Sequence, residues 1–184
     1  KKNQAATFLN YYLPTTEKLL DLSRLDDDIQ GIPEPVDVKQ VAVDALVLLR
    51  PLAKERQIRL RCELEDGCVV MATVDDMFHI IFNLIENAIK YNKKGGSMTV
   101  TVRSEADRCV LTVKDNGIGI PKGEQERIFE RFYRVDKSHS KKIGGTGLGL
   151  SIVKHGVSYL GGTINVESEE GIGTTITVVF PKNI

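Results

Sequence analysis

Three polar side chains that share one side of an expected helix are the first residues that could do chemistry. Asn83, Asn87 and Lys90 stand at positions i, i+4 and i+7, which places them on one stripe of a helix. The other side is apolar, with Ile81, Leu84, Ile85 and Ala88. An amide oxygen is a hard, neutral ligand that suits Mg²⁺, and a lysine one turn away can meet phosphate as a point charge. A solvated polar face explains the same stripe equally well.

A second candidate is the segment 115–120, Asp-Asn-Gly-Ile-Gly-Ile, which directly follows an expected strand. The carboxylate of Asp115 can accept a hydrogen bond from the exocyclic amino group of adenine. Burial of such a pair discriminates strongly, because a wrong base would leave the carboxylate unpaired. Gly117 and Gly119 would let the backbone approach the base closely. A simple Asp-Asn-Gly turn is the alternative, and such turns are common.

A third candidate is the segment 145–150, Gly-Thr-Gly-Leu-Gly-Leu, which opens an expected helix. Free amides at a helix N-terminus hold phosphate by hydrogen bonds and by the helix dipole. The segment lacks the Lys-Ser/Thr of a Walker A loop, and its spacing is one residue too short for the dinucleotide fingerprint. A flexible linker is the alternative, although the apolar Leu148 and Leu150 favour a docked loop.

The stretch that leads into this segment is polar and basic. Residues 120–147 hold seven Lys and Arg against four Asp and Glu, in a chain with no net charge. A polyphosphate bound at the base of this stretch would account for its net positive charge, while a solvated loop is the default explanation. Within it, the run Glu130-Arg131-Phe132-Tyr133-Arg134 is either a hinge that anchors a lid or a helix end tucked into the core.

Helices and strands that could position these residues alternate along the chain. Apolar periodicity predicts helices over 38–56, 75–91 and 147–160, with Asp75 as the N-cap of the second, and a short helix over 121–129. Strands are expected over 58–64, 68–73, 97–104, 108–114, 163–167 and 174–180, the first two turned around Asp66-Gly67. We therefore predict an α/β fold: a two-layer sandwich with a mixed sheet of about five strands, three helices on one face and a mobile lid.

Residues 1–31 form a separate unit in this interpretation. Residues 3–28 are predicted to form a helix whose apolar stripe needs a partner, and Ile-Pro-Glu-Pro at 32–35 is predicted to be a linker. The expected division is therefore 1–31 and 32–184.

Bulk composition narrows the classes of protein. The chain has 25 Lys and Arg and 25 Asp and Glu, so no global field favours nucleic acid or an anionic membrane. Cys62, Cys68 and Cys109 are odd in number and widely spaced, which favours reduced thiols in a cytoplasmic domain. No apolar run is long enough to span a bilayer. Because the chain starts without methionine, we expect a fragment of a longer protein, whose membrane segments, if it has any, lie upstream.

Taken in order, the four segments resemble the N, G1, F and G2 boxes of sensor histidine kinases. That family shares a superfamily with gyrase, the ninety-kilodalton heat-shock chaperone and MutL. The match runs over about residues 36–181, and Gly161-Gly162-Thr163 and residues 171–180 look like the family's terminal strands. Four ordered boxes make the resemblance specific.

The resemblance implies a site for ATP and Mg²⁺ under a lid. It implies that Asn87 ligates Mg²⁺, that Lys90 and Tyr91 approach phosphate, and that Asp115 binds adenine. Asn83 and Lys90 are the expected catalytic residues. The remaining ATP-binding residues implied are Gly117, Gly119, Ile120, Arg131, Phe132, Tyr133, Gly145, Thr146, Gly147, Leu148, Gly149 and Leu150. The implied partners are a histidine-bearing dimerisation domain and a response regulator, in a full-length homodimer that binds no nucleic acid.

Two departures refine this expectation. ATPases of the superfamily carry a glutamate general base where this chain has Asn83, an amide that cannot take a proton, which favours phosphoryl transfer over hydrolysis. His79, His139 and His155 lack the context of a phospho-accepting histidine, so the fragment should bind ATP without phosphorylating itself. The alternatives are a serine kinase of the anti-sigma type and a module that binds nucleotide without transferring phosphate.

Overall fold

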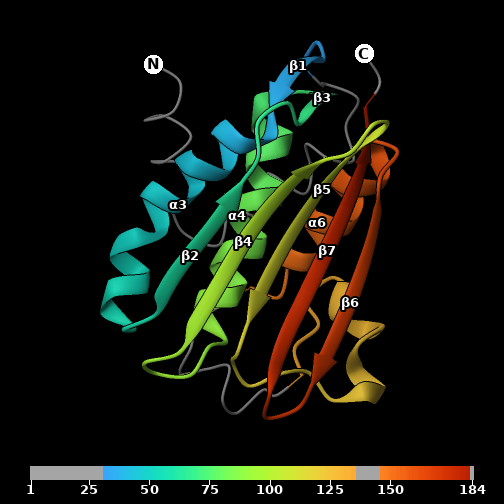
Figure 1. Cartoon of the computed structure of the whole chain (residues 1–184). Coiled ribbons are helices and arrows are strands. Elements are labelled where there is room, and N and C mark those ends of the chain that lie inside the picture. The colour runs from blue at the N-terminus through green and yellow to red at the C-terminus, as the bar shows by residue number, and fades with distance from the viewer. Residues whose placement is uncertain (1–30, 136–145, 183–184) are drawn as a thin grey trace.

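The computed structural model describes residues 31–135 and 146–182, and the expected helix over 3–28 lies outside them. Figure 1 shows two layers, with α3 (Val38–Glu55), α4 (Val74–Lys90) and α6 (Gly149–Tyr159) on one face of a sheet. The sheet has five strands: β2 (Arg59–Leu64), β4 (Ser97–Ser104), β5 (Arg108–Asp115), β7 (Gly173–Pro181) and β6 (Thr163–Glu169). The predicted fold class is confirmed.

The sheet is mixed because its edge strand β2 runs parallel to β4, whereas β4–β5, β5–β7 and β7–β6 are antiparallel. Between β2 and β4 the chain crosses over the sheet through α4, as parallel neighbours require. We predicted that the strands at 58–64 and 68–73 turn back on each other at Asp66-Gly67. This prediction is wrong, because the two strands do not pair with each other. The second strand, β3 (Val69–Ala72), instead pairs with β1 (Glu34–Asp37).

Strand β1 also corrects the interpretation of residues 32–35 as a linker. Glu34 and Pro35 pair with Ala72 and Met71, so they belong to the folded body. Proline tolerates this place because the strand lies at the edge of a two-stranded sheet.

Helix α4 is the centre of the core. Its buried side chains point both to the sheet and to the flanking helices: Met77, Phe78, Ile80, Ile81, Phe82, Leu84, Ile85, Ala88 and Ile89. The strands meet them with every second residue, as in Met98, Val100 and Val102 of β4. The helix begins at Val74, one residue before the predicted start, and its N-cap is Thr73, two residues before the predicted Asp75.

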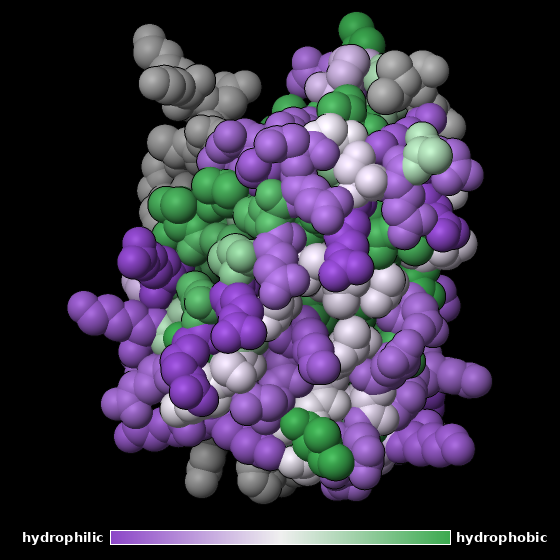
Figure 2. All heavy atoms as spheres, in the orientation of Figure 1, coloured by the Kyte–Doolittle hydropathy of each residue, from purple (hydrophilic) through white to green (hydrophobic). Residues whose placement is uncertain are grey.

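The outer face of the sheet is largely solvated. In Figure 2 the surface over β4, β5, β7 and β6 is mostly purple to white, whereas green side chains gather over α3 and β2. Threonines, which alternate along the strands with the buried residues, point to this outer face. Thr112 and Thr177 lie opposite each other on β5 and β7. The predicted short helix over 121–129 is present as two turns of 3₁₀ helix, Lys122–Glu124 and Arg127–Phe129.

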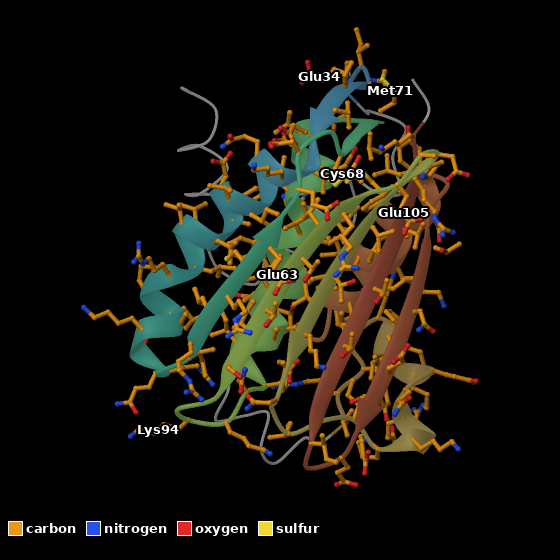
Figure 3. All side chains as sticks on the ribbon, in the orientation of Figure 1. Glu34, Glu63, Cys68, Met71, Lys94 and Glu105 are labelled. Atoms are coloured by element: carbon orange, nitrogen blue, oxygen red, sulfur yellow. A yellow bond between two sulfur atoms is a disulfide. The ribbon has the colours of Figure 1, made fainter. Side chains whose placement is uncertain are left out.

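The expectation of three reduced cysteines is wrong for two of them. Cys68 and Cys109, 41 residues apart, form a disulfide across the core (Figure 3). Both are fully buried, and packing of the loop before β3 against the start of β5 brings their Cα atoms to 5.3 Å. Cys62 is a free, exposed cysteine on β2, and partial burial raises the pKa of its thiol. No helix in residues 31–135 and 146–182 is long and apolar enough to cross a membrane.

Candidate functional site

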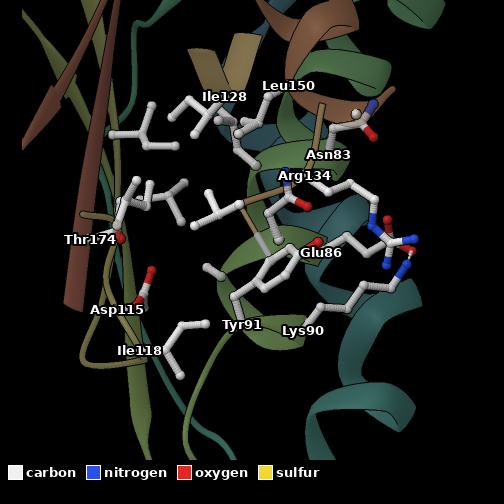
Figure 4. Close-up of a pocket in the computed structure, with 18 of the residues that line it drawn as sticks. Asn83, Glu86, Lys90, Tyr91, Asp115, Ile118, Ile128, Arg134, Leu150 and Thr174 are labelled. Carbon is white, nitrogen blue, oxygen red and sulfur yellow. Dashed lines mark ion pairs between the residues drawn. The ribbon is translucent and has the colours of Figure 1, made fainter. Parts of the chain in front are cut away.

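A cavity lies between α4, the inner face of β5 and β7, and the start of α6 (Figure 4). It collects residues from all four predicted segments. Twelve of the predicted site residues line it: Asn83, Asn87, Lys90, Tyr91, Asp115, Gly119, Ile120, Tyr133, Thr146, Gly147, Gly149 and Leu150. Segments that are up to 67 residues apart in sequence, from Asn83 to Leu150, therefore line one cavity.

Four predicted residues do not line the cavity. Gly117 packs against the backbone at the end of α4, since a Cβ atom there would lie 2.3 Å from the carbonyl oxygen of Tyr91. Leu148 is fully buried and packs with Ile152, so it anchors the start of α6. Arg131 and Phe132 are the other two, and the Phe132 side chain is 60% exposed. Gly145 lies outside the described residues.

The carboxylate of Asp115 stands at one end of the cavity, at the last residue of β5. Its Oδ1 accepts a hydrogen bond of 2.8 Å from the backbone N–H of Gly117. Burial raises the pKa of Asp115 above its ordinary value, and backbone hydrogen bonds from Gly117 and Thr174 oppose that rise. The carboxylate is thus an oriented hydrogen-bond acceptor in a partly buried place.

The loop after Asp115 is held firmly against its neighbours. The N–H of Ile118 donates to the carbonyl of Tyr91 at 3.0 Å, and the N–H of Ile120 donates to Ser168 Oγ at 2.8 Å. Gly119 has a φ of +68°, and a Cβ there would lie 2.0 Å from the carbonyl oxygen of Glu169. Only glycine fits this crossing of two backbones.

Basic side chains gather at the opposite end of the cavity. Figure 4 places Lys90 and Arg134 far from Asp115 and Thr174, with Tyr91 between them. Lys90 Nζ lies 2.8 Å from an oxygen of Glu86. The guanidinium of Arg56 donates to the carbonyl oxygen of Lys90 at 2.8 Å and so fixes the C-terminus of α4.

The start of α6 completes the cavity with Gly147, Gly149 and Leu150. Its N-cap, Leu148, offers no side-chain hydrogen bond, so no side chain of the cap residue occupies the first amides. Gly147, with a φ of +73°, accepts a hydrogen bond of 3.0 Å from the N–H of Phe132. A Cβ at Gly149 would meet the side-chain oxygen of Asn83 at 2.9 Å, so α6 begins directly against α4.

This arrangement matches a known family. The sequence profile described as "Histidine kinase-, DNA gyrase B-, and HSP90-like ATPase" matches residues 72–184. The chain belongs to this ATPase family. The resemblance noted from the four segments is thereby confirmed.

Its curated relatives are sensor histidine kinases. The chain is 41% identical to Sensor histidine kinase WalK of Bacillus subtilis over 89% of its own length and 27% of that protein's. It is 37% identical to Sensor-like histidine kinase SenX3 of Mycolicibacterium smegmatis over 90% of its length and 43% of that protein's. The chain therefore spans less than half the length of these two relatives.

Solved structures agree with this family assignment. The mycobacterial sensor histidine kinase MprB is 29% identical, with a TM-score of 0.69 over 82% of this chain and 97% of that one. Full-length ShkA, solved in complex with AMPPNP, is 26% identical, with a TM-score of 0.75 over 89% of this chain and 34% of that one. Residues 72–184 thus carry the ATP-binding catalytic domain of the histidine-kinase type.

The two asparagines of this ATPase domain differ in their surroundings. Asn83 is 2% exposed, and its amide nitrogen donates to the carbonyl oxygen of His79 at 2.8 Å. Asn87, one turn further, is half-buried and lines the cavity. Among the described residues no three His, Cys, Asp or Glu side chains cluster as a metal site. Asn87 offers an amide oxygen to the cavity. Such a ligand fits Mg²⁺, which takes few protein ligands beside substrate phosphates.

The cavity also contains residues that the site prediction left out. They are Leu84, Glu86, Ala88, Val113, Ile118, Ile128, Arg134, Val135, Thr174 and Ile176. Ile118 and Arg134 lie within the predicted segments. Val113 and Ile176 also carry a sequence signal, because they are register partners on the inner face that the alternation of β5 and β7 indicates. Thr174 follows by the same alternation. Ile128 comes from the 3₁₀ turns, whose packing no periodicity predicts.

Proposed function

We propose that this chain is the catalytic part of a sensor histidine kinase and transfers the γ-phosphate of ATP to a histidine on a dimerisation domain. The phosphate would then pass to a response regulator. The observation that carries the proposal is one cavity with Asp115 at one end, Lys90 at the other and the start of α6 in its lining. Its relatives WalK and SenX3 support the choice of kinase.

The end with Asp115 suits adenine. The carboxylate can accept from the exocyclic amino group, and Thr174 beside it offers a hydroxyl. Thr174 Oγ1 lies 2.8 Å from Ser168 Oγ, so its position is set by β6. Apolar side chains from β5, β7 and the loop after Asp115 supply faces for the flat base: Val113, Ile118 and Ile176.

The opposite end suits a triphosphate with Mg²⁺. Lys90 and Arg134 supply positive charge, and the first amides of α6 can donate to phosphate oxygens. Asn87 would ligate Mg²⁺ through its amide oxygen, and the ion would neutralise charge on the phosphates. Tyr91 and Tyr133 also line the cavity, and Figure 4 places Tyr91 between its two ends.

Transfer is favoured over hydrolysis because Asn83 cannot act as a base. Its amide nitrogen is committed to the carbonyl of His79, and the side chain is almost fully buried. His79 and His155 do not line the cavity, and His139 lies outside the described residues. The acceptor histidine must therefore come from outside the described part of the chain, which agrees with a separate dimerisation domain in a cytoplasmic homodimer.

The test is a transfer reaction between two proteins. The chain is incubated with γ-labelled ATP and Mg²⁺, with or without a separately produced dimerisation domain of a sensor histidine kinase. We expect label only on the added domain, and we expect it to be lost in acid, as phosphohistidine is. Acid-stable label on a serine would favour the serine-kinase alternative, and nucleotide binding without transfer would favour a sensing module.

A further inference from the structure

The hydroxyl of Ser168 joins three segments of the chain beside the end of the cavity that holds Asp115. Ser168 lies near the end of β6, and its register partner on β7 is Thr174. Its Oγ atom lies 2.8 Å from the backbone nitrogen of Ile120 and 3.0 Å from the carbonyl oxygen of Gly173. The same atom lies 2.8 Å from Thr174 Oγ1.

Only one arrangement of protons satisfies all three contacts of Ser168. A serine hydroxyl donates one hydrogen bond and accepts two. The N–H of Ile120 can only donate and the carbonyl of Gly173 can only accept, so Ser168 accepts from the first and donates to the second. One acceptor position then remains for Thr174, whose hydroxyl must therefore donate its own proton to Ser168.

This arrangement decides what Thr174 offers to a ligand. Because its proton is given to Ser168, its oxygen can only accept from a group in the cavity that it lines. Asp115 stands at the same end and accepts a hydrogen bond from the backbone of Thr174 (Figure 4). The two side chains thus form a pair of acceptors. An exocyclic amino group, with two N–H donors, fits such a pair, whereas an oxo group at the same place offers only lone pairs.

We propose that Ser168 determines the base selectivity of the cavity by fixing the proton of Thr174. The inference rests on the proposed function, which assigns adenine to this end. Ser168 itself does not line the cavity, so it is a positioning residue that acts through Thr174. Without Ser168 the hydroxyl of Thr174 can turn and donate to the oxo group of hypoxanthine or guanine. Discrimination against 6-oxo purines then weakens, because the group that they leave unpaired has found a partner.

The experiment measures the affinities of Mg·ATP and of Mg·ITP, the nucleotide of hypoxanthine, by calorimetry in the wild type and Ser168→Ala. The ratio of ATP to ITP affinity should fall about fivefold in the variant, the scale of one neutral hydrogen bond. Ser168→Thr retains a hydroxyl and should retain the ratio. In a Thr174→Val background, Ser168→Ala should leave the ratio unchanged, because the hydroxyl through which Ser168 acts is gone.

Gln125→Ala is the matched control, since it removes the other link between the loop after Asp115 and β6. The side-chain amide of Gln125 donates to the carbonyl oxygens of Ile120 and Ser168 at 3.0 and 2.8 Å, and its loss leaves both hydroxyls in place. A loosened loop should weaken the binding of both nucleotides by the same factor, so the ratio should stay that of the wild type.

Two results would overturn the inference: an unchanged ratio in Ser168→Ala, or a fall of the same size in Gln125→Ala. Ser168→Val serves as a second variant without a hydroxyl if Ser168→Ala does not fold. Failure of the wild type to bind Mg·ATP at all would instead overturn the proposed function.

Discussion

Asp115 serves two opposed requirements at the scale of a single residue. The proposed recognition of the adenine amino group requires the ionised carboxylate, yet burial disfavours the charge and raises the pKa of Asp115. A functional residue often lowers the stability of the fold in this way. The sequence singles out this residue, which the structure places in the cavity, because a carboxylate between a strand and two glycines is a local pattern. It could not predict the burial, which depends on β7.

Exchange of Asp115 for Asn should therefore stabilise the fold at neutral pH. Below the ordinary pKa of an aspartate, about 3.9, the carboxyl is protonated in the folded and the unfolded chain, so the exchange has little effect. As the pH rises through the raised pKa of the folded state, ionisation lowers the stability of the wild type only. Thermal melting of both proteins between acidic and neutral pH measures the difference.

The stability that Asp115→Asn gains over the wild type should grow with pH and persist at neutral pH. The same exchange at the exposed Asp107 controls for the loss of one charge. A stability difference for Asp115→Asn that does not change with pH, or that shrinks as the pH rises, would contradict the assigned burial.

At the scale of elements, existence was predictable and pairing was not. The periods of α3, α4 and β4 are local patterns, and the structure reproduces them within one or two residues. Residues 58–73 look like a hairpin because a turn signal separates two alternating runs. The chain instead pairs β2 with β4 and β3 with β1. Such partners come from distant residues, and no local signal identifies them.

The N-terminus of α4 gives a direct test at this scale. Thr73 Oγ1 accepts from the N–H of Asp76 at 3.0 Å and donates to its carboxylate at 2.6 Å. Thr73→Ala should lower the free energy of unfolding by about 1 kcal/mol, the usual cost of a lost N-cap. Asp75→Ala should cost less, roughly 0.5 kcal/mol, because Asp75 lies in the first turn, where its charge interacts favourably with the helix dipole. Urea unfolding that gives the reverse order would restore Asp75 as the cap.

At the scale of the whole molecule, the cavity exists only once the layers are packed. Its predicted residues come from polar and glycine-rich segments, which carry chemical patterns. The residues that the prediction missed are mostly apolar and read as ordinary core, such as Val113 and Ile176. The pairing of Cys68 with Cys109 is hidden for the same reason, since only the packed layers bring the two together.

The disulfide should stabilise the molecule without touching the site. A cross-link over 41 residues removes loop entropy from the unfolded chain, so full reduction should cost roughly 3–4 kcal/mol. ATP affinity should stay the same, because Cys109 lies near the start of β5 and Asp115 at its end. Urea unfolding with and without reductant measures the first effect, and Cys62→Ser should respond as the wild type does. Three free thiols in the unreduced, unfolded chain would show that the disulfide is absent.

The most direct measurement of the central claim is a calorimetric titration of Mg·ATP into the wild type and Asp115→Asn. The amide keeps the shape but loses acceptor capacity and can turn a donor toward the amino group of adenine. We expect the variant to lose at least about 1.5 kcal/mol of binding free energy, the scale of a hydrogen bond to a charged group. Equal affinity in the two proteins would mean that adenine binds elsewhere and that the cavity between α4, β5 and α6 is not its binding site.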